Sequence, residues 1–487
     1  MNSARLLTTV AIIVGASLTG CDASWQAPLP REGVAAKGLA PTTQPGPDDV
    51  RLDASAIQPM HLDLLAIDLP TVAAVATARN IDILSARQRV EASHGRYASS
   101  IGSALPSLVP AIGFGFHRGG ARDTTGAIVT GNYVALHPAA AVQWVVNPGQ
   151  VIHDVIASRK RLSAAQQDEL SVGVRTLQQA AAQYYGLCLA QAGVSAALEA
   201  QSNAEELVRV AAVRLKAERA VPADDLRAQA ALAGRQQDVL LAVNAFYYAS
   251  VALATTLRLD PAVTHVARPD KLTRTALVRD DMTLDMLMAM AVERRPDLKA
   301  VRELIAAAEA DKAAIAWGGL GPAAITGYQA GGIASRASGV DYPMRLEQVA
   351  TAGAGFRLGL AIIGDLQSAD ARQRLAVLAA QSQLDQLRGE VVAAVQDSRA
   401  SDKLVPLAVR QLAAAQEGLR QVQAAYTAGR AILLDVLDAQ SVLAQARLRY
   451  AQAVAGYNQS RVNILASLGI LDAASLGQPD SLENKGD

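Results

Sequence analysis

The chain has 487 residues, and its 45 basic and 45 acidic side chains give a formal net charge of zero. This balance gives no electrostatic support for a nucleic-acid partner. Hydrophobic residues make up 51% of the chain, but aromatic residues only 4%. A composition rich in alanine and leucine and poor in aromatic residues favours long packed helices over a compact β-rich enzyme.

The first twenty residues have the pattern of a bacterial lipoprotein signal peptide. Arg5 precedes an apolar stretch at residues 6–18 that is short for a membrane span. The sequence LTGC that ends at Cys21 resembles a lipoprotein box. We therefore expect cleavage after residue 20 and a lipid anchor on Cys21, with palmitate or similar acyl chains. An ordinary secretory signal is the alternative, and Asp22 resembles an inner-membrane retention signal of enteric bacteria.

Residues 21–60 are rich in proline, glycine and threonine, which predicts an extended linker behind the lipid anchor. The second cysteine, Cys188, lies in an apolar helical stretch, so we expect a buried thiol and no intrachain disulfide. No run of eighteen apolar residues follows the signal peptide. We therefore expect no transmembrane helix, and a membrane span would require strands closed into a barrel.

One succession of elements is predicted twice, in residues 61–265 and again in residues 266–472, before a polar tail at 473–487. Each copy begins with a helix, expected at about 71–104 and from about 284 to just before Gly321. Glycine-rich stretches with period-two patterning follow and predict one strand hairpin in each copy.

The apolar faces of these hairpins alternate with small or polar residues. We expect the second outward strand at about 323–330, and a turn at Ile363-Gly364-Asp365 after the second return strand. The alternating apolar residues are Leu108, Ile112, Phe114, Phe116, Val142, Trp144 and Val146 in the first copy, and Ala352, Ala354, Phe356, Leu358, Leu360 and Ile362 in the second.

A long helix follows each hairpin, at about 151–217 and 366–428, and reaches roughly 90–100 Å at 1.5 Å per residue. Pro406 lies inside the second and predicts a kink or a local break. A short interruption and a shorter helix complete each copy.

These shorter helices reveal the duplication most clearly. With an offset of 211, residues 217–260 align without gaps on 428–471, and 13 of the 44 pairs are identical. Both helices carry a seven-residue repeat, which predicts left-handed coiled-coil packing. The repeat positions are Val436, Leu443, Tyr450, Tyr457 and Ile464 in the second copy, and Leu232, Val239, Phe246 and Leu253 in the first.

Four membrane-length strands cannot close a barrel alone, so several chains would have to pool them. The duplicated unit, the proline stops before both hairpins, and the sequences YTAGR at 426–430 and LDVLDAQ at 434–440 resemble the TolC-like outer-membrane efflux protein family, in its lipoprotein branch of outer-membrane factors. The resemblance implies a mainly α fold with a membrane β-barrel. Three copies would form a homotrimer whose 12-stranded barrel continues into an α-helical periplasmic tunnel.

The resemblance also implies the function. The chain would be the outer-membrane channel subunit of a tripartite efflux or export system, a passive duct in the cell outer membrane. Its implied partners are outer-membrane lipid, a periplasmic adaptor (membrane fusion) protein and an inner-membrane pump that delivers solutes. A periplasmic adaptor or a coiled-coil lipoprotein scaffold is the alternative.

The candidate site is a periplasmic aperture, assigned from the family pattern. Asp435 and Asp438 match the family's aperture aspartates, Tyr426 matches a tyrosine that helps to hold the tip closed, and Asp224 aligns with a first-repeat aspartate of the same contacts. Arg430 lies one position before the family's basic residue. Carboxylates that converge from several subunits would repel one another, by about 1 kcal/mol per pair at 4 Å in water.

The sequence gives no support for an enzyme. Six histidines are scattered without metal-ligand spacing, and no phosphate-binding glycine loop or nucleophile triad is present. We therefore expect no catalytic residue, no metal and no cofactor apart from the lipid anchor on Cys21.

Overall fold

The computed structural model describes residues 50–52, 64–122, 126–218, 220–268, 271–275, 282–337, 340–356 and 359–477. These residues are mostly helical, with one four-stranded antiparallel sheet and two two-stranded sheets. The predicted signal peptide with Cys21, most of the predicted linker, and residues 478–487 of the predicted tail lie outside the described residues.

The two halves of the chain show the same order of elements, as the sequence pattern predicts. Each half has two consecutive helices, a strand hairpin, a long helix and a shorter helix. The first half comprises α2 (Leu69–Arg79), α3 (Ile81–Gly102), β3 (Ser107–Arg122), β4 (Ile128–Val146), α4 (Pro148–Lys216) and α5 (Pro222–Leu257). The second half comprises α6 (Leu284–Arg294), α7 (Pro296–Leu320), β7 (Pro322–Ala337), β8 (Val340–Phe356), α8 (Ala361–Thr427) and α9 (Leu433–Ser467).

Four short strands form the two small sheets, which tie the start of one half to the start of the other. The antiparallel pair joins β1 (Val50–Arg51) to β6 (Lys271–Leu272), and the parallel pair joins β2 (Leu64–Ile67) to β5 (Thr264–Ala267).

The helix expected at 71–104 is divided in two, and so is its counterpart in the second half. Asn80 ends α2, and its side chain accepts the backbone N–H of Asp82 at 2.8 Å, which caps α3. In the second half the break falls at Arg295, because the following Pro296 disfavours a helical conformation in the residue before it.

The four-stranded sheet has the order β3-β4-β7-β8, so the two predicted hairpins lie side by side. Its registers include Phe114 opposite Leu136 and Trp144 opposite Thr326. Large apolar side chains remain exposed along it, among them Ile112 at 79% and Leu346 at 89%. Strands β3 and β8 form the two edges, where one side of each strand lacks a partner within the sheet.

The predicted end of the second hairpin is wrong. Strand β8 stops at Phe356 and helix α8 begins at Ala361, so Ile362 and the expected turn at 363–365 are helical. Alternation over the last few residues could not locate this boundary, because Leu360 and Ile363 are exposed and no buried face distinguishes strand from helix there. A glycine in a long helix costs only about 1 kcal/mol, so Gly364 did not stop it.

Helix α8 continues through Pro406, so the local break is absent and the alternative, a kink, stays a prediction. Proline removes one helical hydrogen bond. Buried side chains on both sides of it, Val405 and Ala408, keep this part of the helix packed.

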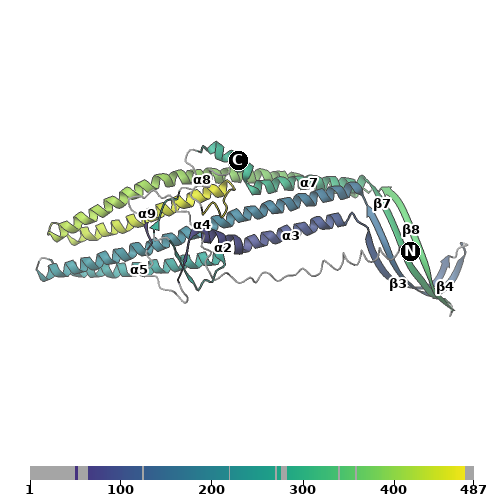
Figure 1. Cartoon of the computed structure of the whole chain (residues 1–487), viewed down its shortest axis with the longest axis horizontal. Helices are drawn as coiled ribbons and strands as arrows, with labels where there is room; N and C mark the ends of the chain where they lie inside the picture. The colour runs from purple at the N-terminus through teal and green to yellow at the C-terminus, as the bar shows by residue number, and fades with distance from the viewer. Residues whose placement is uncertain are drawn as a thin grey trace. The chain divides into compact units, whose positions relative to one another are not determined.

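The long helices α4 and α8 carry the strands at one end and the turns into α5 and α9 at the other (Figure 1). Helix α4 packs against α3, α7, α5 and α9, and α8 packs against α7 and α9. The predicted heptad seam of α9 is buried, since Val436, Leu443, Tyr450, Tyr457 and Ile464 are each less than 10% exposed.

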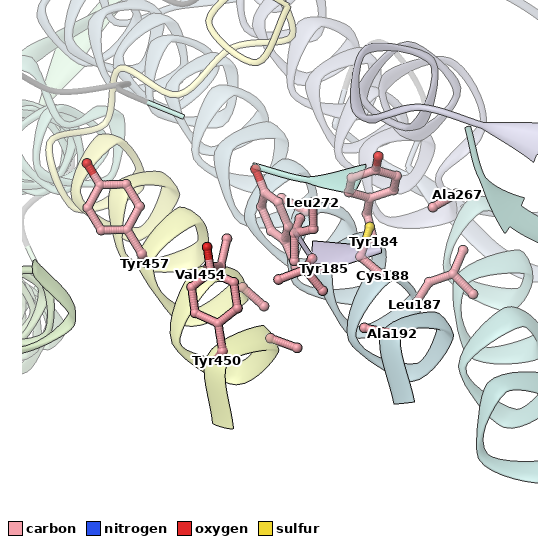
Figure 2. Packing of buried hydrophobic residues seen from close by; sticks show 14 of the residues in the cluster. Tyr184, Tyr185, Leu187, Cys188, Ala192, Ala267, Leu272, Tyr450, Val454 and Tyr457 are labelled. Carbon is pink, nitrogen blue, oxygen red and sulfur yellow. The ribbon is translucent and has the colours of Figure 1, made fainter. Parts of the chain in front are cut away.

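Tyrosines and small apolar residues fill the middle of this helical region (Figure 2). Tyr184, Tyr185 and Cys188 lie on α4, with Tyr450 and Val454 on the neighbouring α9. Burial raises the pKa of the Cys188 thiol to about 12, so the thiol is a core group and not a reactive one.

Helix α5 bears on the expectation that the chain has no transmembrane helix, which stays a prediction. Among the described helices it alone is long and apolar enough by length and composition. A strict count of apolar residues misses it because Asn244 and Ser250 interrupt the stretch. Phe246 and Leu253 are buried, whereas Tyr248 is exposed, so the apolar residues of α5 lie on more than one face.

Candidate functional site at the two helix turns

The turn between α8 and α9 is a glycine-terminated helix end. Gly429 has a φ of +74°, in the left-handed region. Its N–H donates to the Tyr426 carbonyl at 3.0 Å, and the N–H of Arg430 donates to the Ala425 carbonyl at 2.8 Å. These two bonds form a Schellman motif, which satisfies the last carbonyls of α8 and fixes where the chain reverses.

The end of α4 has a left-handed residue at the equivalent place. Glu218, which is 211 residues before Gly429, has a φ of +55°, and its N–H donates to the Leu215 carbonyl at 3.0 Å. A side chain in this conformation is strained where glycine is not. The two helix ends therefore share a left-handed residue and the hydrogen bond from its N–H, but differ in conformational cost.

Acidic side chains follow each turn, in the first helical turn after it. Asp224 lies in the first turn of α5, 3.6 Å from the Arg227 guanidinium. Asp435 lies in the first turn of α9 and accepts the backbone N–H of Ile432 at 3.1 Å. Carboxylates are stabilised at helix N-termini by the unpaired amides and the helix dipole. Asp438 lies on the next turn of α9 and is exposed.

Tyr426 lies in the last turn of α8 and is only 3% exposed. Its hydroxyl is buried and has no hydrogen-bond partner in the described part of the chain. Burial is the main reason that the pKa of this phenol is raised, and the Asp224 carboxylate raises it further while the Arg214 guanidinium opposes the shift. Tyr426 and Asp224 are thus within electrostatic reach, without a hydrogen bond between them.

The basic group at this place is Arg214, which the sequence reasoning missed. Its guanidinium lies over the Tyr426 ring, 4.3 Å from the ring centroid, and donates a hydrogen bond to the Tyr426 carbonyl. The predicted Arg430 is exposed, and among the described residues its side chain has no ion-pair or hydrogen-bond partner. In the sequence, Arg214 is only one of two basic residues in the last turn of α4.

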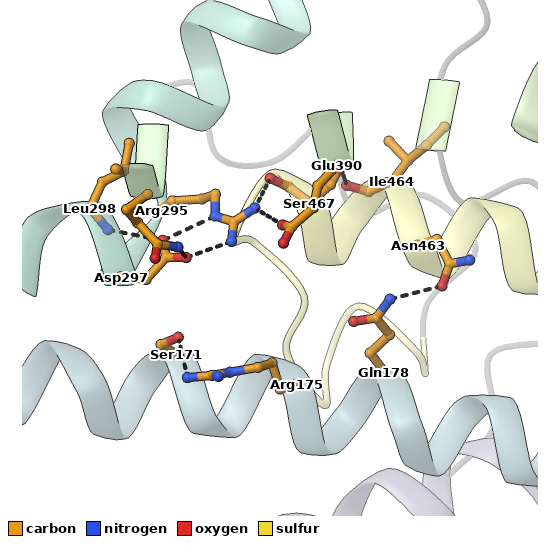
Figure 3. Close-up of polar contacts among 11 residues, drawn as sticks. Ser171, Arg175, Gln178, Arg295, Asp297, Leu298, Glu390, Asn463, Ile464 and Ser467 are labelled. Atoms are coloured by element: carbon orange, nitrogen blue, oxygen red, sulfur yellow. Dashed lines mark hydrogen bonds and ion pairs between the residues drawn. The ribbon is translucent and has the colours of Figure 1, made fainter. Parts of the chain in front are cut away.

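Polar contacts join α4 to α9 along the rest of their length. Gln178 donates to the Asn463 side chain at 3.0 Å, as Figure 3 shows, and Gln440 donates to the Asn203 carbonyl at 3.0 Å. Arg447 forms an ion pair with Glu199. The contact between the two halves is therefore partly polar, in contrast to the buried heptad seam of α9.

A cavity of about 940 Å³ lies where α7 begins and α9 ends. Arg295 lines it and is 11% exposed; it binds Asp297 at 3.0 Å and also contacts Glu390 and the Ser467 carbonyl (Figure 3). The charged side chains of this cluster pair with one another, so the cluster stabilises the fold at this place.

The described residues include no group of three or more histidine, cysteine, aspartate or glutamate side chains that could hold a metal ion. The aperture assignments of Asp224, Tyr426, Arg430, Asp435 and Asp438 stay predictions, now with the positions given above.

Comparison with known proteins places part of the chain in a family. Residues 287–470 match the family model of the outer membrane efflux protein. No curated protein matches the chain by sequence.

Solved structures match nearly the whole chain. The outer-membrane channel OprN aligns with a TM-score of 0.71 and 19% identity, covering 88% of this chain and 98% of that one. VceC from Vibrio cholerae aligns at 0.69 and 18%, covering 82% and 96%. The open state of the MtrE outer-membrane channel from Neisseria gonorrhoeae aligns at 0.66 and 19%, covering 89% and 96%. At these identities the likeness establishes the fold.

Proposed function

Since residues 287–470 carry the outer membrane efflux protein domain, we propose that the chain is the channel subunit of a tripartite efflux or export system. It would conduct solutes passively, and the energy would come from an inner-membrane pump. A periplasmic adaptor protein would join the two. OprN, VceC and MtrE, which share the fold, are outer-membrane proteins, and we propose the outer membrane as the location of this chain too.

The observation that carries this proposal is the open four-stranded sheet. Its edge strands β3 and β8 lack partners on one side, and it exposes large apolar side chains such as Ile112, Phe114 and Leu346. In water such a sheet would aggregate, whereas edge-to-edge pairing of several copies within lipid satisfies both the edges and the apolar face. Three copies of four strands give a closed barrel of twelve, the homotrimer that we propose.

The helices support the same assembly. Helix α5 exposes Leu240, Leu241 and Tyr248, and α8 exposes Leu375 and Leu378, each by more than half. Contiguous exposed apolar side chains of this kind mark protein contacts. We propose that these faces meet neighbouring copies, so that long helices from three subunits form the wall of a periplasmic tunnel.

We further propose that acylated Cys21 anchors the mature N-terminus in the outer membrane. Two signals hold proteins in a bilayer more firmly than one acyl chain alone. Here the barrel would be the first signal and the acyl chains the second.

The turns at the far ends of α4 and α8 would form the periplasmic aperture. Three copies each of Asp224, Asp435 and Asp438 would converge there and attract cations. Their mutual repulsion, at about 4 kcal/mol for a pair 4 Å apart at an effective dielectric of 20, favours a wider opening. The contacts of Tyr426 favour the closed aperture. Adaptor binding therefore needs to change the free-energy difference between the closed and open states only modestly.

Single-channel recording tests the aperture. We expect the double substitution Asp435→Ala and Asp438→Ala to lower cation selectivity and to weaken block by divalent cations from the periplasmic side. Asp238→Ala is the matched control, because Asp238 is an exposed carboxylate paired with Arg235 in the middle of α5. Unchanged selectivity and block in the double variant would remove Asp435 and Asp438 from the aperture.

The rival assignments fit less well. An adaptor needs only one helical hairpin flanked by β-rich domains, whereas the described residues of this chain form two helical hairpins and two long antiparallel strand hairpins. A coiled-coil scaffold would explain the helices but not the apolar strands.

A further inference from the structure

We infer that Arg214 is the latch that holds the α8–α9 turn against the α4–α5 hairpin when the aperture is closed. This inference rests on the proposed function and concerns a residue outside the family pattern used above. Arg214 makes two contacts with Tyr426: its guanidinium stacks on the ring at 4.3 Å, and it donates to the carbonyl. Each contact crosses from one half of the chain to the other.

The electrostatics of the two helix ends favour a cation at this position. Helices α4 and α8 both end at these turns, so both present partly negative carbonyl ends there (Figure 1). Arg214 belongs to the last turn of α4 and binds a carbonyl in the last turn of α8. One charge therefore stabilises two like-signed helix ends that would otherwise repel, and only while they are close together.

The stacking contact is favourable because the Tyr426 ring is buried. A guanidinium over a desolvated aromatic face is held more strongly than one over an exposed face. Its planar group can stack on the ring and donate to the carbonyl at once, which an ammonium group does less well.

The duplication shows that this contact occurs once in each subunit. With the offset of 211, Arg214 corresponds to Ala425 and Tyr426 corresponds to Leu215. The reciprocal pair therefore has neither a cation nor an aromatic ring. Loss of the contacts between Arg214 and Tyr426 would weaken the attachment of the α8–α9 turn to α4, and no symmetric contact would replace them.

Arg214→Met tests the latch, with Tyr426→Leu and the double variant completing a thermodynamic cycle. Arg214→Met removes both contacts, so the open-state occupancy of single channels should rise by about tenfold. Tyr426→Leu removes the ring but keeps the carbonyl, so its effect should be smaller. The double variant should show a smaller effect than the sum of the two single effects, because both single variants remove the same contact between the ring and the guanidinium. Arg214→Lys should restore part of the closure.

Arg209→Met is the control. Arg209 is another arginine of α4, but it is exposed and pairs with Glu206 of the same helix. It should leave occupancy unchanged. Circular dichroism and the oligomer size of every variant are measured first, so that misfolding is recognised.

Two failures have different meanings. If the wild-type protein conducts but Arg214→Met gates like it, or if the two single effects simply add, the latch is refuted. If the wild-type protein forms no pores, the proposed function fails before the latch is tested.

Discussion

Four residues at helix ends have a positive φ, and the free-energy cost of this backbone conformation can be predicted for each of them. Glu218 and Arg258 in the first half have φ values of +55° and +56°, and Gly429 and Gly469 in the second half have +74° and +71°. The offset of 211 relates Glu218 to Gly429 and Arg258 to Gly469. In the second pair, too, the chain folds back through Schellman bonds, from Leu259 to Ala254 and from Ile470 to Leu465.

Replacement of the two glycines by alanine should destabilise the protein to different extents. At Gly429 a new Cβ meets only the end of the Arg214 side chain, at 3.9 Å, so only the strained φ contributes, about 1–2 kcal/mol. At Gly469 the new Cβ lies 2.8 Å from the Arg295 Cα and 3.0 Å from the Pro296 Cδ. Overpacking against backbone adds about 1–3 kcal/mol, for a total of about 2–5 kcal/mol. Glu218→Gly relieves strain and should gain about 0.5–1 kcal/mol.

Unfolding of the detergent-purified protein by guanidinium chloride, followed by helical circular dichroism, measures this order of stability. Gly389→Ala is the control, since Gly389 lies inside α8 with open space around it and alanine favours the helix by about 1 kcal/mol. The reasoning would be refuted if Gly469→Ala were no more destabilising than Gly429→Ala.

Two further predictions concern the strand–helix junction and pH. Gly149→Ala would place a Cβ against the Trp317 ring, so it should displace that ring and lower the thermal midpoint, while Gly173→Ala on the same helix should not. His265 is 1% exposed, and burial lowers its pKa below the usual 6.5, so below pH 6.5 the unfolded chain takes up a proton that the folded chain does not. Stability should therefore fall as the pH drops from 7.5 to 5.5, measured by denaturant midpoints, and His265→Gln should reduce that fall.

The spacing of the apolar residues and the internal duplication of the sequence predicted most of the fold. Apolar residues recur on one face of a helix or strand at a spacing that is characteristic of each. This spacing predicted the strand hairpins, the long helices and the buried heptad seam of α9. The boundary at Ala361 and the continuity through Pro406 could not be predicted, because local propensity there is overridden by the helix on either side. The breaks at Asn80 and Arg295 carried readable signals, a capping asparagine and a following proline.

Only those residues of the candidate site that belong to a local sequence motif could be predicted. Residues 426–438 were located from their own sequence, and the structure places them at one turn and the helix after it. Arg214 could not be found in this way, because its role depends on a contact between residues 212 positions apart. No local pattern distinguishes it from Lys216 nearby.

The central claim is that several copies together make a pore that no single chain can make. Planar-bilayer recording of the protein purified in detergent, with its oligomer mass determined on the same sample, tests this most directly. We predict trimers that insert and conduct ions in discrete steps. A stable, water-soluble monomer that produces no conductance would contradict it.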